Sequence, residues 1–102
     1  MVFIESPLLS RRVSECLGED EYAALQWALT LHPESGAVIP GSGGVRKLRW
    51  SAERRGKRGG VRVVYYWRDT RGEIWLLTIY DKHETENIPG HILKKLREEL
   101  VE

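Results

Sequence analysis

A dense run of basic side chains occupies the middle of the chain, over residues 45–71. This stretch holds ten of the sixteen Lys and Arg residues and only two carboxylates, Glu53 and Asp69, so it carries +8 in a chain whose net charge is +1. Cations gathered into one part of a near-neutral protein are typical of a surface that binds a polyanion. The stretch runs into a strongly apolar segment, so we expect several of its charges to be held on rigid backbone.

The periodicity of the strands predicts that some of these cations converge on one site. Alternate side chains share a face of a strand, so in residues 61–67 Arg62 lies with Val64 and Tyr66, away from an apolar set expected in the core. The next strand, residues 74–80, should pair with this one and is followed by a polar loop. We therefore expect one concave site lined by Lys57, Arg58, Arg62, Tyr80, Lys82 and His83.

Such a group of donors with one imidazole suits the phosphodiester of RNA. Cleavage without a metal ion needs a group that takes the 2′-OH proton, positive charge on the phosphorane, and a proton for the 5′ leaving oxygen. Guanidinium binds phosphate oxygens in pairs, and clustered cations lower the pKa of a neighbouring lysine, which can then act as a base. The alternative is a solvated basic surface that grips nucleic acid without cutting it.

The other residues of the cluster have two interpretations each. His83 suits either proton role near neutral pH, or it is a loop histidine in water. Tyr80 either stacks on a base or orients phosphate, or it packs at the end of its strand. Outside the site, the cations expected to contact RNA are Arg46, Lys47, Arg49, Arg54 and Arg55.

The flanking segments predict the elements that carry this site. Residues 2–4 read as a strand, and Ser6 as N-cap with Pro7 in the first turn predicts a helix through about residue 17. Acidic residues 19–21 followed by an apolar stripe predict a second helix that ends at Pro33. Residues 34–44 read as a glycine-rich loop, residues 45–50 as a strand, and residues 51–60 as a mobile cationic hairpin loop. Pro89 begins a last helix, with an apolar face formed by Ile92, Leu93, Leu96 and Leu100.

The element order β-α-α-β-β-β-α predicts an α+β fold. We expect a small antiparallel, partly mixed sheet of about four strands, two N-terminal helices packed on one face, and a C-terminal helix. At 102 residues the chain is expected to form a single domain, 1–102.

Composition narrows the setting and the chemistry. Cys16 is the only cysteine, which excludes an intrachain disulfide and indicates a reducing cytosol. No Cys/His cluster indicates a zinc site, so no metal is expected. No segment reads as a signal peptide or a membrane span, so we expect a soluble, intracellular protein.

Three segments together resemble HigB-type toxins of the RelE/ParE superfamily. They are VIPGSGGVRKLR at residues 38–49, GKRGGVRVVYY at residues 56–66 and LLTIYDKHE at residues 76–84. The similarity extends over essentially the whole chain, including the order of its elements, and it implies a RelE-like fold.

The resemblance implies the toxin of a bacterial type II toxin–antitoxin pair. Such a toxin is a cytoplasmic endoribonuclease that enters the ribosomal A site and cleaves mRNA there, which inhibits translation. The products carry 2′,3′-cyclic phosphate or its hydrolysed form, and no metal or cofactor takes part. The implied partners are the ribosome with its mRNA and a cognate helix-turn-helix antitoxin of the HigA type.

Carried over by position, the family's phosphate-stabilising arginine falls on Arg62. Its loop cations fall on Lys57 and Arg58, one of which serves as base, and the basic position after the last strand falls on Lys82 and His83. The sequence departs from RelE-type members at that last position, where they place an arginine in line with His83 and a catalytic tyrosine a few residues later. This chain has Asn-Ile-Pro at residues 87–89 instead, so the proton donor to the leaving oxygen stays open.

Two other functions fit a basic protein with these features. One is a ParE-like inhibitor that binds DNA gyrase without catalysing a reaction, although such members usually lack the cations found at Lys57, Arg58 and Arg62. The other is a non-catalytic nucleic-acid-binding module, which would bind RNA or DNA with a strong dependence on salt.

Overall fold

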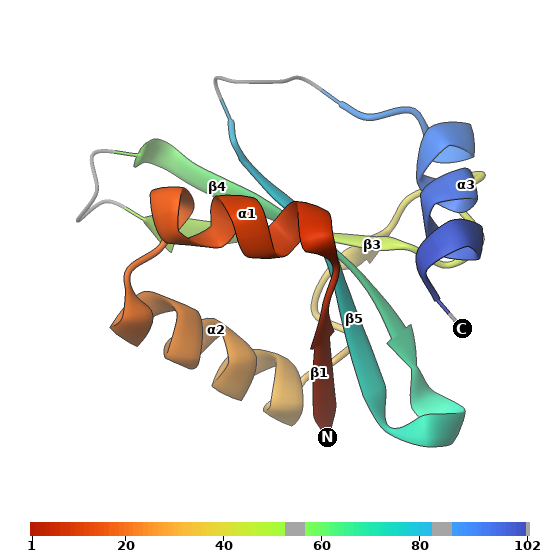
Figure 1. Ribbon diagram of the computed structural model, residues 1–102, viewed down its shortest axis with the longest axis horizontal. Coiled ribbons are helices and arrows are strands. Elements are labelled where there is room, and N and C mark those ends of the chain that lie inside the picture. The colour runs from red at the N-terminus through yellow and green to blue at the C-terminus, as the bar shows by residue number, and fades with distance from the viewer. Residues whose placement is uncertain (53–56, 83–86, 102) are drawn as a thin grey trace.

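The computed structural model describes residues 1–52, 57–82 and 87–101, and at residues 52, 57 and 58 it describes the backbone alone. In chain order the elements are β1 (Val2–Glu5), α1 (Pro7–Cys16), α2 (Glu19–Leu31), β2 (Ala37–Val38), β3 (Arg46–Ala52), β4 (Lys57–Arg68), a 3-10 turn (Asp69–Arg71), β5 (Glu73–Asp81) and α3 (Gly90–Leu100). The expected α+β class and the order of its main elements are confirmed (Figure 1).

The two N-terminal helices begin where their capping residues predict. The Ser6 hydroxyl accepts from the Leu9 amide at 3.1 Å and donates to the Leu77 carbonyl, so one side chain caps α1 and ties it to β5. At α2 the Glu21 carboxylate accepts from the Gly18 amide at 2.8 Å, the reciprocal half of a capping box. His32 is the C-cap that precedes Pro33, as the sequence indicates.

Five strands form one mixed sheet in the order β1-β5-β4-β3-β2. β1 is parallel to β5, and the other neighbours are antiparallel. The strand that the sequence did not predict is β2, which lies within the expected glycine-rich loop. It forms because the Ser42 hydroxyl accepts from the Val45 amide at 3.0 Å and the Ile39 amide donates to the Val45 carbonyl at 2.8 Å, which folds this segment back onto β3.

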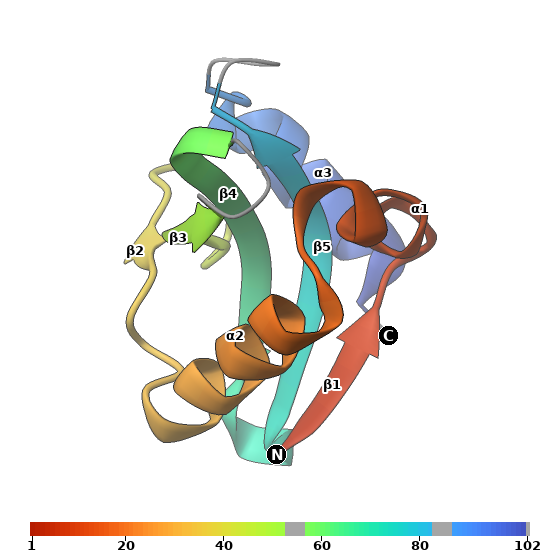
Figure 2. The ribbon, with the colours of Figure 1, turned by 90° about the vertical axis from the view of Figure 1, so that its left-hand side faces the viewer.

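Each face of the sheet has its own core. Val61, Val63 and Tyr65 of β4 pack with α1 and α2, whereas Val64 of β4 packs with Leu93 of α3 on the opposite face. In Figure 2, β4 and β5 pass between α2 in front and α3 behind. Neither α1, α2 nor α3 is long and apolar enough to span a membrane.

The prediction that Ile92 lies on the buried apolar face of α3 is wrong. Leu93 is buried and Leu96 and Leu100 pack against the second core, but Ile92 is 47% exposed. A helix that contacts a sheet along one narrow stripe buries about two positions per turn, and Ile92 falls beside that stripe.

Tyr65 connects the sheet to the segment after α2. Its fully buried hydroxyl accepts from the Gly36 amide at 2.8 Å and donates to the Pro33 carbonyl at 2.7 Å. Replacing Tyr65 with phenylalanine leaves both backbone groups without that partner, so Tyr65→Phe should lower the free energy of unfolding by about 1–3 kcal/mol. Urea denaturation followed by circular dichroism measures the change.

Tyr22→Phe is the matched control, because it removes the same atom from an exposed hydrogen bond to Glu5. We expect it to cost less than about 1 kcal/mol. Equal losses in the two variants would contradict the structural role assigned to the Tyr65 hydroxyl.

Candidate nucleic-acid interface

A wide β-bulge between β3 and β4 shapes the candidate site. Trp50 pairs with Val61 and Ala52 pairs with Lys57, so the single residue Ser51 faces three residues of β4. Two of those three are Gly59 and Gly60, which have φ angles of +79° and +76°. A Cβ on Gly60 would lie 2.4 Å from the Trp50 carbonyl oxygen, so only glycine allows the two backbones to approach this closely.

The bulge corrects one prediction from the sequence. Residues 51–60 were expected to form a mobile hairpin loop, but β3 continues to Ala52 and β4 begins at Lys57. Because the bulge absorbs the extra residues, pairing resumes beyond it. The backbones of Lys57 and Arg58 therefore belong to a strand rather than a loop, and the structure does not describe their side chains.

A polar hollow of about 280 Å³ opens at the bulge. It is lined by Arg49, Ser51, Gly59 and Gly60. Arg49 lies directly opposite Arg62 in the β3–β4 register, and the two side chains share the sheet face that α1 and α2 leave free. Arg49 thus lines the hollow, and Arg62 occupies the opposite position of the strand pair beside it.

Arg62 is held in place on both sides. Its Nη1 donates to the Gly59 carbonyl at 3.0 Å, and its partner across the β4–β5 pairing is Tyr80. This contact uses one of the five N–H donors of the guanidinium. Arg62 therefore presents a fixed positive charge beside the hollow.

Lys82 approaches the same point from the end of β5. A Cβ placed on Gly59 would lie 2.8 Å from Lys82 Cδ and 3.5 Å from its Nζ, so the lysine side chain passes over this glycine. Arg62 and Lys82 consequently meet at Gly59, with Arg49 across the strand pair. Of the residues predicted to line one concave site, Arg62 and Lys82 lie together at Gly59, and Arg49, predicted as an RNA contact outside that site, lies beside them.

Tyr80 does not play the exposed role considered for it. A second bulge pairs Val64 with Thr78 and Tyr65 with Leu76, which leaves Leu77 as the extra residue of β5. The bulge turns Tyr80 toward the core that contains Leu93, where it is only 4% exposed, so it packs at the end of its strand rather than stacking on a base. Burial raises the pKa of Tyr80, and the charge of Arg62 partly opposes that rise.

The remaining predicted contacts divide between the two faces. Lys47 lies on the face of Arg49, and its Nζ donates to Asn87 Oδ1 at 2.7 Å. Arg46 points to the opposite face, where Nη1 donates to the Glu34 and Gly36 carbonyls at 3.0 and 2.8 Å and the guanidinium lies 6.0 Å from the centre of the Trp67 ring. Arg46 therefore stabilises the fold and lies away from the hollow.

Three predicted residues, Arg54, Arg55 and His83, lie outside the residues that the structure describes. Two residues of the site were missed by the sequence analysis. Ser51 continues the alternation of Lys47 and Arg49, so the pattern of β3 contained its signal. Asn87 had no such signal, because its contact with Lys47 joins residues forty positions apart.

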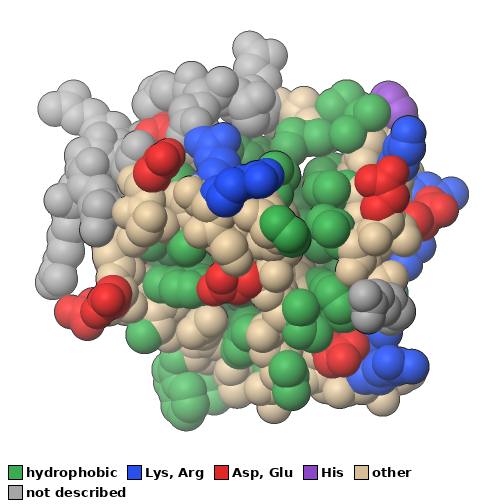
Figure 3. Space-filling view, viewed as in Figure 1, with side chains coloured by type: hydrophobic (Ala, Val, Ile, Leu, Met, Phe, Trp, Pro, Cys, Tyr) green, Lys and Arg blue, Asp and Glu red, His purple; other side chains and the backbone are tan. Residues whose placement is uncertain are grey.

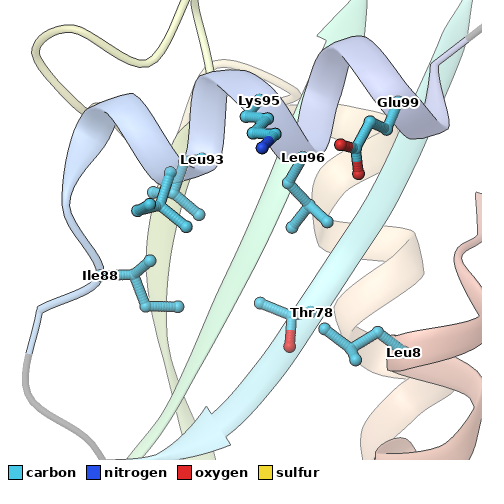
Figure 4. Close-up of a pocket in the computed structure, with 8 residues that line it drawn as sticks. Leu8, Thr78, Ile88, Leu93, Lys95, Leu96 and Glu99 are labelled. Atoms are coloured by element: carbon cyan, nitrogen blue, oxygen red, sulfur yellow. The ribbon is translucent and has the colours of Figure 1, made fainter.

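A larger hollow of about 460 Å³ is apolar and separate from this site. It lies between α1 and α3 above Thr78, and Figure 4 shows Leu8, Ile88, Leu93 and Leu96 pointing into it. Among the residues that the structure describes, it shares none with the cationic hollow, and the charged members of its lining are Lys95 and Glu99. Within residues 1–52, 57–82 and 87–101, no group of His, Cys, Asp or Glu side chains could hold a metal ion.

Comparison with solved structures identifies the fold. The chain is similar to the toxin RelE in the crystal structure of the intact E. coli RelBE toxin–antitoxin complex, with a TM-score of 0.59, 13% sequence identity and coverage of 78% of this chain and 94% of the other. It is also similar to a mutant of E. coli RelE in the free state, with a TM-score of 0.55, 17% identity and coverage of 83% and 86%. No family model matches the sequence. The RelE-like fold expected from the sequence is thereby confirmed.

The opposite placement of Arg46 and Arg49 can be tested with a single-stranded RNA oligonucleotide. Arg49→Ala should weaken binding and reduce the slope of log K against log salt by about 0.7, the value for one lost phosphate contact. Arg46→Ala should leave that slope unchanged and lower the free energy of unfolding by about 1–2 kcal/mol. Fluorescence anisotropy over a salt series and urea denaturation measure the two effects. Equal losses of RNA affinity would show that the two faces do not differ in function.

Proposed function

We propose that this protein is the toxin of a type II toxin–antitoxin pair, of the HigB type, and that it cleaves mRNA in the ribosomal A site. The observation that carries the proposal is the meeting of Arg62, Lys82 and Arg49 around the glycine bulge of β4. The RelE-like fold and the HigB-like sequence segments support it. The protein would act in the cytoplasm on ribosome-bound message.

The proposed reaction is an internal displacement at phosphorus without a metal ion. The 2′-oxygen of one nucleotide loses its proton to a base and forms a bond to the phosphorus, and the bond from phosphorus to the 5′-oxygen of the next nucleotide breaks. The leaving oxygen takes a proton from an acid. The products are a 2′,3′-cyclic phosphate and a free 5′-hydroxyl, and the cyclic phosphate can then be hydrolysed.

Arg62 is the residue best placed to stabilise the phosphorane. Its position is fixed by the Gly59 carbonyl and by the buried Tyr80 beneath it, so little reorganisation is needed when negative charge develops. Lys82 and Arg49 flank the same point and can bind the neighbouring phosphate oxygens. We assign the proton transfers to residues among Lys57, Arg58, Lys82 and His83, of which the structure describes the side chain of Lys82.

The proposal includes an inhibitory partner. The E. coli toxin RelE was crystallised in complex with its antitoxin. A cytoplasmic nuclease that cuts the mRNA of translating ribosomes must likewise be inhibited in the cell that makes it. We propose a cognate helix-turn-helix antitoxin of the HigA type in this role.

The nuclease proposal predicts specific cuts in mRNA when the purified protein is added to a translation extract. Primer extension maps the new 5′ ends, and Arg62→Ala should lower the rate of cleavage by about 10²-fold or more, because it removes a contact that strengthens in the transition state. Arg68→Ala is the control: it removes an equal charge from the same strand, at a position where Arg68 pairs with Glu73 at 3.5 Å.

Three outcomes separate the alternatives. Intact message with continued protein synthesis would refute the nuclease proposal. Loss of gyrase supercoiling in the presence of the protein would identify a ParE-like inhibitor. Salt-dependent RNA binding on translating ribosomes without any cut would identify a non-catalytic binding module.

The chemical mechanism makes a separate prediction. A message that carries a single 2′-deoxynucleotide immediately 5′ of the mapped cut should stay intact at that position, because the attacking oxygen is missing. Cleavage at the other sites of the same message serves as the internal control. An unchanged cut at the deoxy position would show that water, rather than the 2′-hydroxyl, attacks the phosphorus.

A further inference from the structure

The outer face of α2 carries an exposed apolar stripe. Trp27 is 66% exposed and Leu31 is 56% exposed, and these residues are one helical turn apart. Ala23 and Ala24 are exposed on the turn before them. Figure 3 shows hydrophobic side chains at the surface of the region where Figure 1 places α2. The stripe thus combines one large protruding ring with a flat, small-residue surface beside it.

This helix is apolar on both of its sides. Leu25 and Leu29 are buried in the core that α1 and α2 share with the sheet, while Trp27 and Leu31 face solvent. A helix on the surface of a globular protein normally has one apolar side, and a helix that is apolar all round is normally buried. The composition of α2 therefore fits a helix with a second packing partner.

The shape of the stripe suits another helix. Small residues such as Ala23 and Ala24 allow a neighbouring backbone to approach closely, and ridges of side chains then fit into grooves. Tryptophan is the residue type most enriched among those that dominate binding energy at interfaces. Trp27, which stands next to the alanines, has the position of a central anchor.

The charges around the stripe select the kind of partner. Glu19, Asp20 and Glu21 lie in the first turn of α2, and the helix contains no Lys or Arg. Residues 1–36 contain six acidic residues and two basic ones, Arg11 and Arg12, so this part of the chain has a net charge of −4. Two copies of the acidic surface would repel each other, whereas a basic surface would be attracted to it.

We infer that the outer face of α2 is the docking surface for a basic, amphipathic helix of the inhibitory partner, which rests on the proposed function for the existence of that partner. The surface lies on the sheet face opposite Arg62, since Leu48 and Trp50 of β3 pack on the α2 side while Arg49 points to the other. Variants of α2 should therefore leave catalysis intact.

The test uses the full-length protein and the product of the adjoining gene, purified separately and titrated by calorimetry. Trp27→Glu should weaken the complex by about 30-fold or more, because it removes the anchor and adds a further negative charge at the apolar centre. Asp20→Lys should weaken it several-fold and reduce its dependence on salt. Hydroxyl-radical footprinting should show Trp27 protected in the complex.

Ile92→Glu is the matched control. It places the same charge on another exposed apolar residue, in the hollow between α1 and α3, and should change the affinity by less than about twofold. All three variants alter exposed positions, and circular dichroism checks that they fold. Each should still cleave mRNA in the translation extract.

Several results would overturn the inference. In calorimetry, these are an affinity of Trp27→Glu for the partner within about threefold of the parent's, loss of the complex in Ile92→Glu alone, or no complex with the parent protein. In footprinting, it is a Trp27 that is not protected when the partner is added. A concentration-dependent dimer abolished by Trp27→Glu would assign the stripe to a second copy instead. Failure of the nuclease proposal is distinct, because it would appear as intact mRNA while the Trp27-dependent complex still forms.

Discussion

β4 hydrogen-bonds to β3 along one edge and to β5 along the other, and it occupies the centre of the sheet. Its alternation divides the molecule, since Val61, Val63 and Tyr65 fill the core under α1 and α2, and Val64 helps to fill the core under α3. Arg62 interrupts the second series. It can do so because the wide bulge at Gly59 and Gly60 opens the β3–β4 pairing beside it, and the guanidinium finds a carbonyl and solvent there instead of a core.

The concentration of positive charge at this bulge has a physical cost that a ligand can offset. Arg49 and Arg62 are adjacent across the strand pair and Lys82 passes over Gly59, so like charges are held close together. Exposure to water and salt screens most of the repulsion in the free protein. A phosphate in the hollow would replace repulsion by charge-assisted hydrogen bonds, which is why a site of this kind binds polyanions more strongly than its individual charges predict.

The two sides of the sheet therefore present opposite chemistry. The face that carries the bulge is basic and glycine-rich, while α2 on the other face is acidic and exposes Trp27. The near-neutral net charge of the chain conceals this separation, which is visible only when charges are assigned to faces. The nucleic-acid site and the partner site that we propose therefore lie on different surfaces of the molecule.

Features that depend on side-chain types at short spacing could be predicted from the sequence. Ser6 and Pro33 mark helix ends, the alternation in β4 separates Arg62 from Val61 and Val63, and the order of the main elements along the chain follows from the run of apolar segments. Arg46 could also have been placed correctly, because the alternation in β3 puts it on the face of Leu48 and Trp50 rather than that of Arg49.

The bulges, the extra strand β2, the burial of Tyr80 and the contact of Lys47 with Asn87 depend on how distant segments pack together in the folded chain. The one-residue bulge of β5 shifts every later side chain of that strand to the other face, and the position of a bulge depends on how two strands fit together rather than on either strand alone. The extent to which Trp27 protrudes also depends on that packing, because the periodicity of α2 directs Leu25 and Leu29 to the core but does not say what covers the opposite side of the helix.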